Sequence, residues 1–246
     1  MATPFISYIA GSFMDSPLSK PMIKRFARQN GIDLNQAAET RFKSFNAFFT
    51  RHLKDGLRPL CGEGLFASPC DALLSVYTIK DESRFQIKGA SYSIADLVED
   101  EGIARDFSGG RCLIFRLTPA HYHRYIFPCD GSIIDHKKIK GIYHTVRPTA
   151  VEKAQVLRTN TREYVLCETE EYGRLLIMEV GALLVGRIVN HKTSGDFSKG
   201  EEKGYFEFGG STVVVLAQKD RLNLDRRFDT QDEKSVYAGE ALTNPF

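Results

Sequence analysis

The chain beyond residue 64 consists largely of short apolar segments separated by glycine, aspartate or proline, and this pattern constrains the fold more than any other feature. Eight segments are rich in β-branched residues: LLSVYTIK, RFQIKG, RCLIFRLT, YHRYIF, SIIDHKKIK, EYVLCETE, RLLIMEV and TVVVLAQ. Segments of this length and composition are typical of strands. Asp130-Gly131 and Tyr172-Gly173 stand between apolar runs, as hairpin turns do. The sequence therefore predicts mostly antiparallel β structure, interrupted by one helix near residues 93–103, with residues 232–246 as a surface tail.

The first 56 residues have a helical pattern instead. Apolar side chains recur at three- and four-residue spacing, Gly31 stands where a helix would stop, and Ser44 precedes the segment FNAFFTRHL. We expect three short helices. The predicted fold class is α+β: a single domain with an N-terminal helical cap (residues 1–56) on a mostly antiparallel β-sheet or barrel-like core (residues 57–246).

Composition excludes some classes of function and leaves others open. The net charge is +2, from 33 basic and 31 acidic side chains, so nothing indicates a nucleic-acid partner. The five cysteines form no Cys-x-x-Cys pair, and we expect no structural disulfide. The N-terminal apolar stretch is short and interrupted, which predicts neither a signal peptide nor a transmembrane span. No nucleotide-binding, dinucleotide-binding or Gly-x-Ser-x-Gly motif is present.

Gly209-Gly210-Ser211-Thr212 stands immediately before the apolar run VVVLA. In the ordinary interpretation it is a turn into a strand, since glycine permits a positive φ and the hydroxyls bond local backbone. In the chemical interpretation the Ser211 hydroxyl attacks the preceding Gly210 carbonyl, so that an ester replaces the amide. The pattern alone leaves both open.

Two further segments carry side chains suited to chemistry. His121 and His123 would share one face of a strand, where two imidazoles can meet a metal or a substrate. A metal site would need a third ligand from His136, His144, His191 or Asp71, and none has a diagnostic spacing. The segment FASPCDALLS places Asp71 before a strand, either as a turn residue or as a carboxylate that orients a histidine.

Taken together and in order, these segments resemble the phosphatidylserine decarboxylase family, as proenzymes, over nearly the whole chain. The segments that carry the resemblance are SFNAFFTRHLKDGLRPL, SPCDALLS, IKGASYSIADL, LTPAHYHRY, GALLVGRI and KGEEKGYFEFGGSTVVVL. Each is a modest signal alone, whereas their shared order is specific.

The resemblance implies that the chain cuts itself between Gly210 and Ser211. It would leave a β chain, residues 1–210, and an α chain, residues 211–246, that stay associated, with Ser211 converted to a covalent pyruvoyl cofactor. That carbonyl is an electron sink for decarboxylation of phosphatidylserine to phosphatidylethanolamine. The catalytic residues implied are Ser211, His123, which handles a proton, and Asp71, which assists self-processing. No metal is implied.

The chain departs from the family pattern at the processing base. Many members carry a second histidine three residues after the first, and this chain has Ile126 there. His123 would serve both steps, or His121, His144 or His191 would substitute. Two smaller departures are Ala72 for a glycine after the aspartate and Gly209 for a leucine before the cleaved bond.

A lipid substrate also implies a peripheral place at the cytoplasmic face of the cell membrane. Apolar residues of the cap would either meet lipid, beside Lys20, Lys24, Arg25 and Arg28, or pack on the core. The residues concerned are Phe5, Ile6, Ile9, Phe13, Phe45, Phe48 and Phe49. A homodimer is left open. Three alternatives to this function stay open: a metal-dependent hydrolase using His121 and His123, a non-catalytic binding module, and a decarboxylase for another lipid with a serine headgroup.

Overall fold

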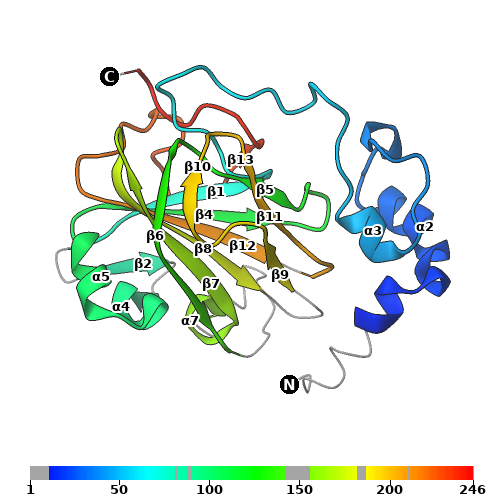
Figure 1. Cartoon of the computed structure of the whole chain (residues 1–246), viewed down its shortest axis with the longest axis horizontal. Helices are drawn as coiled ribbons and strands as arrows, with labels where there is room; N and C mark the ends of the chain where they lie inside the picture. The colour runs from blue at the N-terminus through cyan, green and yellow to red at the C-terminus, as the bar shows by residue number, and fades with distance from the viewer. Residues whose placement is uncertain are drawn as a thin grey trace.

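The computed structural model describes residues 11–80, 83–87, 90–141, 156–181, 187–209 and 211–245. Its centre is an eight-stranded sheet in which every neighbouring pair is antiparallel (Figure 1). In spatial order the strands are β10 (Gly195–Phe197), β6 (Gly131–Ile139), β7 (Arg162–Thr169), β8 (Gly173–Gly181), β12 (Ser211–Ala217), β4 (Arg111–Leu117), β1 (Ala72–Thr78) and β13 (Lys234–Val236). The α+β class and the antiparallel sheet are confirmed, and the sheet is open rather than closed into a barrel.

A three-stranded antiparallel sheet covers one face of this large sheet. It consists of β5 (Arg124–Ile126), β11 (Glu202–Phe206) and β9 (Ile188–Asn190). Because successive side chains of a strand point to opposite faces, β12 supplies both cores. Val213 and Val215 pack with Tyr125 and Phe206 between the two sheets. β12 is buried at every position, as the run STVVVLA predicts.

Three short helices and a hairpin lie at the opposite face. They are α4 (Ile94–Val98), α5 (Glu101–Asp106), α7 (Val156–Thr159), and the pair β2 (Arg84–Ile87) and β3 (Ala90–Ser93). The single helix expected at 93–103 is two helices, because Glu99 has a left-handed φ of 54° and ends α4.

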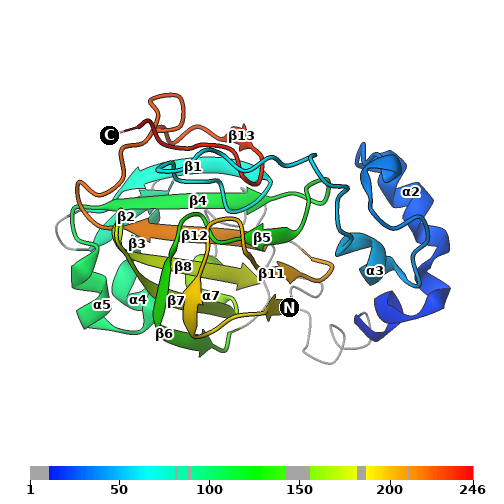
Figure 2. The ribbon, with the colours of Figure 1, turned by 45° about the horizontal axis from the view of Figure 1, so that its top comes forward.

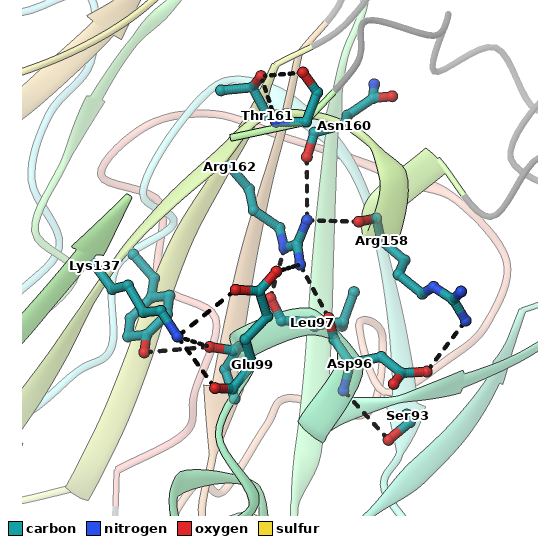
Figure 3. Close-up of polar contacts among 12 residues, drawn as sticks. Ser93, Asp96, Leu97, Glu99, Lys137, Arg158, Asn160, Thr161 and Arg162 are labelled. Carbon is teal, nitrogen blue, oxygen red and sulfur yellow. Dashed lines mark hydrogen bonds and ion pairs between the residues drawn. The ribbon is translucent and has the colours of Figure 1, made fainter. Parts of the chain in front are cut away.

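Arg162 of β7 holds these helices to the sheet. Its buried guanidinium donates to the carbonyls of Leu97 at 2.6 Å, Asp96 at 3.0 Å and Arg158 (Figure 3). Carbonyls at the ends of helices have no partner within the helix, so one arginine satisfies the ends of both α4 and α7.

The cap lies at one end of the large sheet, beside β5 and β11 (Figure 2). It contains a helical turn at residues 11–15, η1 (Pro17–Ser19), α2 (Pro21–Gln29), η2 (Leu34–Gln36) and α3 (Phe45–Phe49). Ser44 caps α3 by accepting the amide of Ala47, and Gly31 follows α2 with a φ of 66°.

The lipid-facing interpretation is wrong for three of the cap's aromatic residues. Phe45, Phe48 and Phe49 are buried against one another and against Phe26, which forms edge-to-face contacts with all three. Phe13 is 41% exposed, and Phe5, Ile6 and Ile9 lie outside the described residues. Among the helices of the described ranges, none has the length and apolar character needed to cross a membrane.

The expectation of a surface tail at residues 232–246 is also wrong. β13 pairs with β1, Ala241 bridges Ala67, and Leu242 is buried in the core between the sheets. β13 forms one edge of the large sheet. The polar, irregular sequence of this segment gives no sign of its pairing with β1 and Ala67, which lie more than 150 positions earlier in the chain.

Candidate active site

Ser211 is the first residue of β12 and lies in the middle of the large sheet. Its backbone pairs with Leu117 of β4 on one side and with Gly181 of β8 on the other. The side chain is fully buried, and Oγ has no hydrogen-bond partner among the residues that the structure describes. A buried hydroxyl without a partner is uncommon, because the lost hydration is not replaced. Gly210 lies outside the described residues.

His123 is the second buried polar group without a partner. Its Nδ1 is 2.9 Å from the carbonyl oxygen of His121, so Nδ1 carries the proton and donates. Nε2 then has a free lone pair, is buried, and accepts no hydrogen bond from the described part of the chain. Burial, aided by the charge of Arg51, lowers the pKa of His123 to about 3. At neutral pH the imidazole is an uncharged base, with Nε2 as its accepting atom.

Two short connections bring Ser211 and His123 to the same end of the structure. β4 ends at Leu117, which pairs with Ser211, and six residues later the chain reaches His123. From the other direction, the Phe206 amide donates to the His123 carbonyl at 2.9 Å, and five residues later the chain enters β12. The expectation that His121 and His123 lie on a strand is wrong, because β5 begins only at Arg124.

Asp71 lies just before β1 and is bound by an arginine. Arg58 approaches it with two nitrogens, Nε to Oδ1 at 2.7 Å and Nη2 to Oδ2, and the Ala238 amide donates to Oδ1 at 2.9 Å. Its carboxylate contacts no histidine among the described residues and acts only electrostatically on His121, whose pKa it raises against the larger effect of burial. The predicted role of Asp71 in processing stays a prediction.

The other candidate bases are differently placed. His121 uses Nδ1 to accept the Thr118 amide at 3.0 Å, which leaves its Nε2 as a donor when the ring is neutral. His191 is 3.0 Å from Glu202, and His136 is 3.0 Å from Glu163. His144 lies outside the described residues. Ile126 is on β5 opposite Glu202. Of the histidines that the structure describes, His123 alone combines full burial with an unpartnered acceptor nitrogen.

The cap holds the residues that precede Ser211. Asn46 of α3 accepts the Phe208 amide at 3.0 Å through Oδ1, and its Nδ2 donates to Asp15 at 2.9 Å. The Phe208 ring packs edge-to-face on the Phe49 ring, with the ring centroids 5.2 Å apart, and the His123 ring also contacts the Phe49 ring, with centroids 4.0 Å apart. One phenylalanine thus touches both the strand entry and the base.

The sequence alone does not predict that side chains between residues 46 and 58 contact the site. Asn46, Phe49 and Arg58 all belong to the segment SFNAFFTRHLKDGLRPL, which was assigned no chemical role. Their partners are 162, 74 and 13 positions away in the chain, respectively, so no local pattern could have joined them. The only available signal was the grouping of an amide and two arginines among phenylalanines.

The site contains a hydroxyl and a neutral imidazole, which together can transfer a proton and an acyl group. Within the described ranges, no group of three or more histidine, cysteine, aspartate or glutamate side chains is placed to hold a metal ion. The arrangement is suited to chemistry on a carbonyl carbon.

Comparison with known proteins identifies the family. The family model described as phosphatidylserine decarboxylase matches residues 45–244. A phosphatidylserine decarboxylase proenzyme of Ruminiclostridium cellulolyticum is 41% identical over 248 residues, covering 97% of this chain and 83% of that protein. A phosphatidylserine decarboxylase proenzyme 2 of Clostridium acetobutylicum is 40% identical, covering 92% and 77%, and a proenzyme of Fusobacterium nucleatum is 37% identical, covering 98% and 83%. The chain belongs to the phosphatidylserine decarboxylase family.

Proposed function

We propose that this chain is the precursor of a pyruvoyl-dependent enzyme that converts phosphatidylserine to phosphatidylethanolamine and carbon dioxide. The observation that carries the proposal is a pair of buried atoms without hydrogen-bond partners among the described residues: Ser211 Oγ, at the start of β12, and His123 Nε2, which short connections bring to the same end of the structure. Relatives named as proenzymes of this decarboxylase support both the reaction and the self-cleavage.

The cleavage begins with an attack by Ser211 on the residue before it. His123 Nε2 takes the proton from Oγ, Oγ bonds to the Gly210 carbonyl carbon, and the carbon–nitrogen bond breaks as the nitrogen gains a proton. Removal of the Ser211 α proton then expels the Gly210 carboxylate and leaves a dehydroalanine. Its enamine tautomerises, and water replaces the nitrogen, which leaves as ammonia. The product is a keto group at position 211.

The residues around Ser211 fit a pyruvoyl group at this position. β4 and β8 pair with the two sides of β12, so the end of the new α chain stays fixed. Among the described residues, none forms a hydrogen bond with Ser211 Oγ that the conversion would have to break. When formed, the group supplies an electron sink for an amine substrate. His123 Nε2 then takes a proton from the substrate ammonium and returns it to the carbon that loses carbon dioxide, which balances the reaction.

The two chains produced by cleavage stay associated in this proposal. β12 lies between β8 and β4, and β13 pairs with β1, so the α chain is part of the sheet at two places. Separating it would break seven paired positions on each side of β12 and expose the core of both faces.

We further propose a peripheral location at the cytoplasmic face of the cell membrane. Three large apolar side chains of the cap are exposed: Phe13 at 41%, Leu18 at 76% and Met22 at 39%. The exposed basic residues of the cap between residues 20 and 28 are Lys20, Lys24, Arg25 and Arg28. Apolar and basic side chains together suit the surface of an anionic bilayer.

The mass of the purified protein tests the cleavage. We expect two fragments divided between residues 210 and 211, with the smaller one lighter by one ammonia than its unmodified peptide, and a single uncut chain for Ser211→Ala. A folded wild-type chain that stays uncut would contradict the proposal.

Incubation with lipid tests the reaction itself. The cut protein should convert phosphatidylserine to phosphatidylethanolamine, whereas uncut Ser211→Ala should convert none. A cut protein that is inactive on phosphatidylserine but active on another serine-containing lipid would keep the chemistry and change the substrate.

A further inference from the structure

Arg51 is a buried cation that the proposed mechanism does not use. It follows α3 and is 4% exposed, with its guanidinium over the Phe48 ring at 5.1 Å. Nη1 makes one long hydrogen bond, at 3.4 Å, to the Phe48 carbonyl. Nε is buried and has no hydrogen-bond partner in the described ranges. Most donors of this guanidinium are therefore available to a ligand.

The carboxylates that act electrostatically on Arg51 are bound to other residues. Asp71 and Glu39 act on Arg51 electrostatically, but Asp71 is bound by Arg58 and Glu39 by His52. Within the described ranges Arg51 forms no ion pair. Two arginines thus lie near one buried aspartate, which leaves an excess of positive charge. A buried charge without a counterion is costly, so the site favours an anion.

Arg51 belongs to the same site as His123. The neighbouring Thr50 carbonyl accepts Arg124 Nε at 2.8 Å, which fixes this turn of the cap against β5, and Phe49 contacts the His123 ring. The charge of Arg51 contributes to the low pKa of His123, as expected for a cation close to the imidazole. An anion bound to Arg51 would therefore lie beside the base and the start of β12.

We propose that Arg51 binds the phosphodiester of the substrate headgroup; this rests on the proposed function. Phosphatidylserine offers two anions, a phosphodiester and a carboxylate. The carboxylate loses its charge as carbon dioxide leaves, so an arginine bound to it would stabilise the starting state more than the transition state and slow the reaction. The phosphodiester keeps its charge throughout. Arg51 on the phosphodiester positions the headgroup without opposing decarboxylation.

Binding of the product separates the two anions, because phosphatidylethanolamine has the phosphodiester and lacks the carboxylate. We would measure the Kd of dihexanoyl phosphatidylethanolamine by calorimetry for cut wild-type protein, Arg51→Gln and Arg51→Lys. The expected result is a loss of about tenfold or more for Arg51→Gln, with a smaller loss for Arg51→Lys. Exposed Arg226, located on the α chain, supplies the matched control Arg226→Gln, which should bind as wild type does.

Two outcomes would overturn the proposal. An unchanged Kd for Arg51→Gln would show that Arg51 does not bind the phosphodiester. An unchanged product Kd together with a raised KM for phosphatidylserine would assign Arg51 to the carboxylate instead. If Arg51→Gln is not cut, the same Kd is compared between Ser211→Ala and Ser211→Ala/Arg51→Gln, which need no cleavage. Failure of the proposed function is a separate result, since wild type would then be uncut or inactive.

Discussion

At the residue scale, Ser211 Oγ and His123 Nε2 are buried polar atoms that have no hydrogen-bond partner among the described residues, and short connections bring both residues to the same end of the structure. An unsatisfied buried group costs about 1–3 kcal/mol, so Ser211 Oγ and His123 Nε2 lower the stability of the precursor. Such groups persist where function requires them. An apolar side chain at this position would leave no unsatisfied hydroxyl, so chemistry rather than packing accounts for the serine.

Replacing His123 should therefore stop or slow cleavage. We expect His123→Asn to cut at least about a hundredfold more slowly than wild type, because a general base contributes about 10²–10⁴-fold. His191→Asn should cut at the wild-type rate, since His191 bonds to Glu202 at 3.0 Å. The measurement is the half-time of cleavage of newly synthesised precursor on a denaturing gel. Normal cutting by His123→Asn would assign the base to another residue.

The pKa of His123 also predicts how the stability of the precursor depends on pH. The folded chain keeps His123 neutral down to about pH 3, whereas the unfolded chain protonates it near its ordinary value of 6.5. As the pH falls below 6.5, the unfolded state gains a proton that the folded state lacks, so stability is lost by up to about 1.4 kcal/mol per pH unit. Above 6.5 this contribution is constant.

Urea unfolding of uncut protein measures this effect. Between about pH 7 and about pH 5, Ser211→Ala should lose about 2 kcal/mol more than Ser211→Ala/His123→Asn, which has no imidazole to protonate at this position. Other titrating groups are common to both proteins and cancel in the difference. Equal losses in the two proteins would show that His123 is protonated in the folded state.

At the element scale, the cap contributes to the site through α3. Asn46→Ala would leave the Phe208 amide without its acceptor and release the segment that enters β12. The loss of about 1–3 kcal/mol should appear as cleavage about tenfold slower, because the attacking geometry is held less often. Asn35→Ala, at an exposed position of η2, is the control. Equal cleavage half-times for the two variants would confine α3 to a packing role.

The elements that sequence predicted share one property: their signal is local. TVVVLAQ and RCLIFRLT are continuous β-branched runs that become β12 and β4, and Ser44 and Gly31 delimit helices of the cap by their own backbone preferences. β13 was missed because Lys234–Val236 has no apolar alternation and forms only by pairing with β1. Burial of a whole strand can be predicted from composition, whereas an edge strand depends on its neighbour.

In the candidate site too, local motifs predict some features, whereas others depend on residues far away in the chain. Ser211 and His123 were assigned from motifs before any geometry was known, and the structure gives each of them an unpartnered atom. The tautomer of His123 depends on the His121 carbonyl, and the salt bridge of Asp71 depends on Arg58, so neither could be predicted from spacing. The sequence identifies Arg51 as a cation, but only the structure shows that it is buried and forms no ion pair with the residues described.

At the scale of the whole molecule, cleavage should not separate the two chains. The α chain begins with a central strand of the large sheet. Near its end, Ala241 forms a β-bridge with Ala67, and the Leu242 amide donates to the Phe66 carbonyl. We expect cut protein to elute as one species in gel filtration without denaturant and to show two bands on a denaturing gel. Loss of the 36-residue chain under native conditions would mean that the sheet opens after cleavage.

The exposed face of the cap predicts how the molecule meets its substrate. Leu18 is 76% exposed, and burying a leucine in a bilayer surface is worth about 1.5–3 kcal/mol, while each lysine near an anionic surface adds about 1 kcal/mol. Leu18→Asp and Lys20→Glu/Lys24→Glu should therefore sediment with phosphatidylglycerol vesicles at least about tenfold more weakly than wild type, and high salt should weaken the binding of wild type.

Ile134→Asp is the matched control, because Ile134 is 48% exposed on β6, outside the cap. If Ile134→Asp loses as much binding as Leu18→Asp, the contact with lipid is not specific to the cap. If neither variant loses binding, the exposed apolar side chains of the cap do not contact the bilayer.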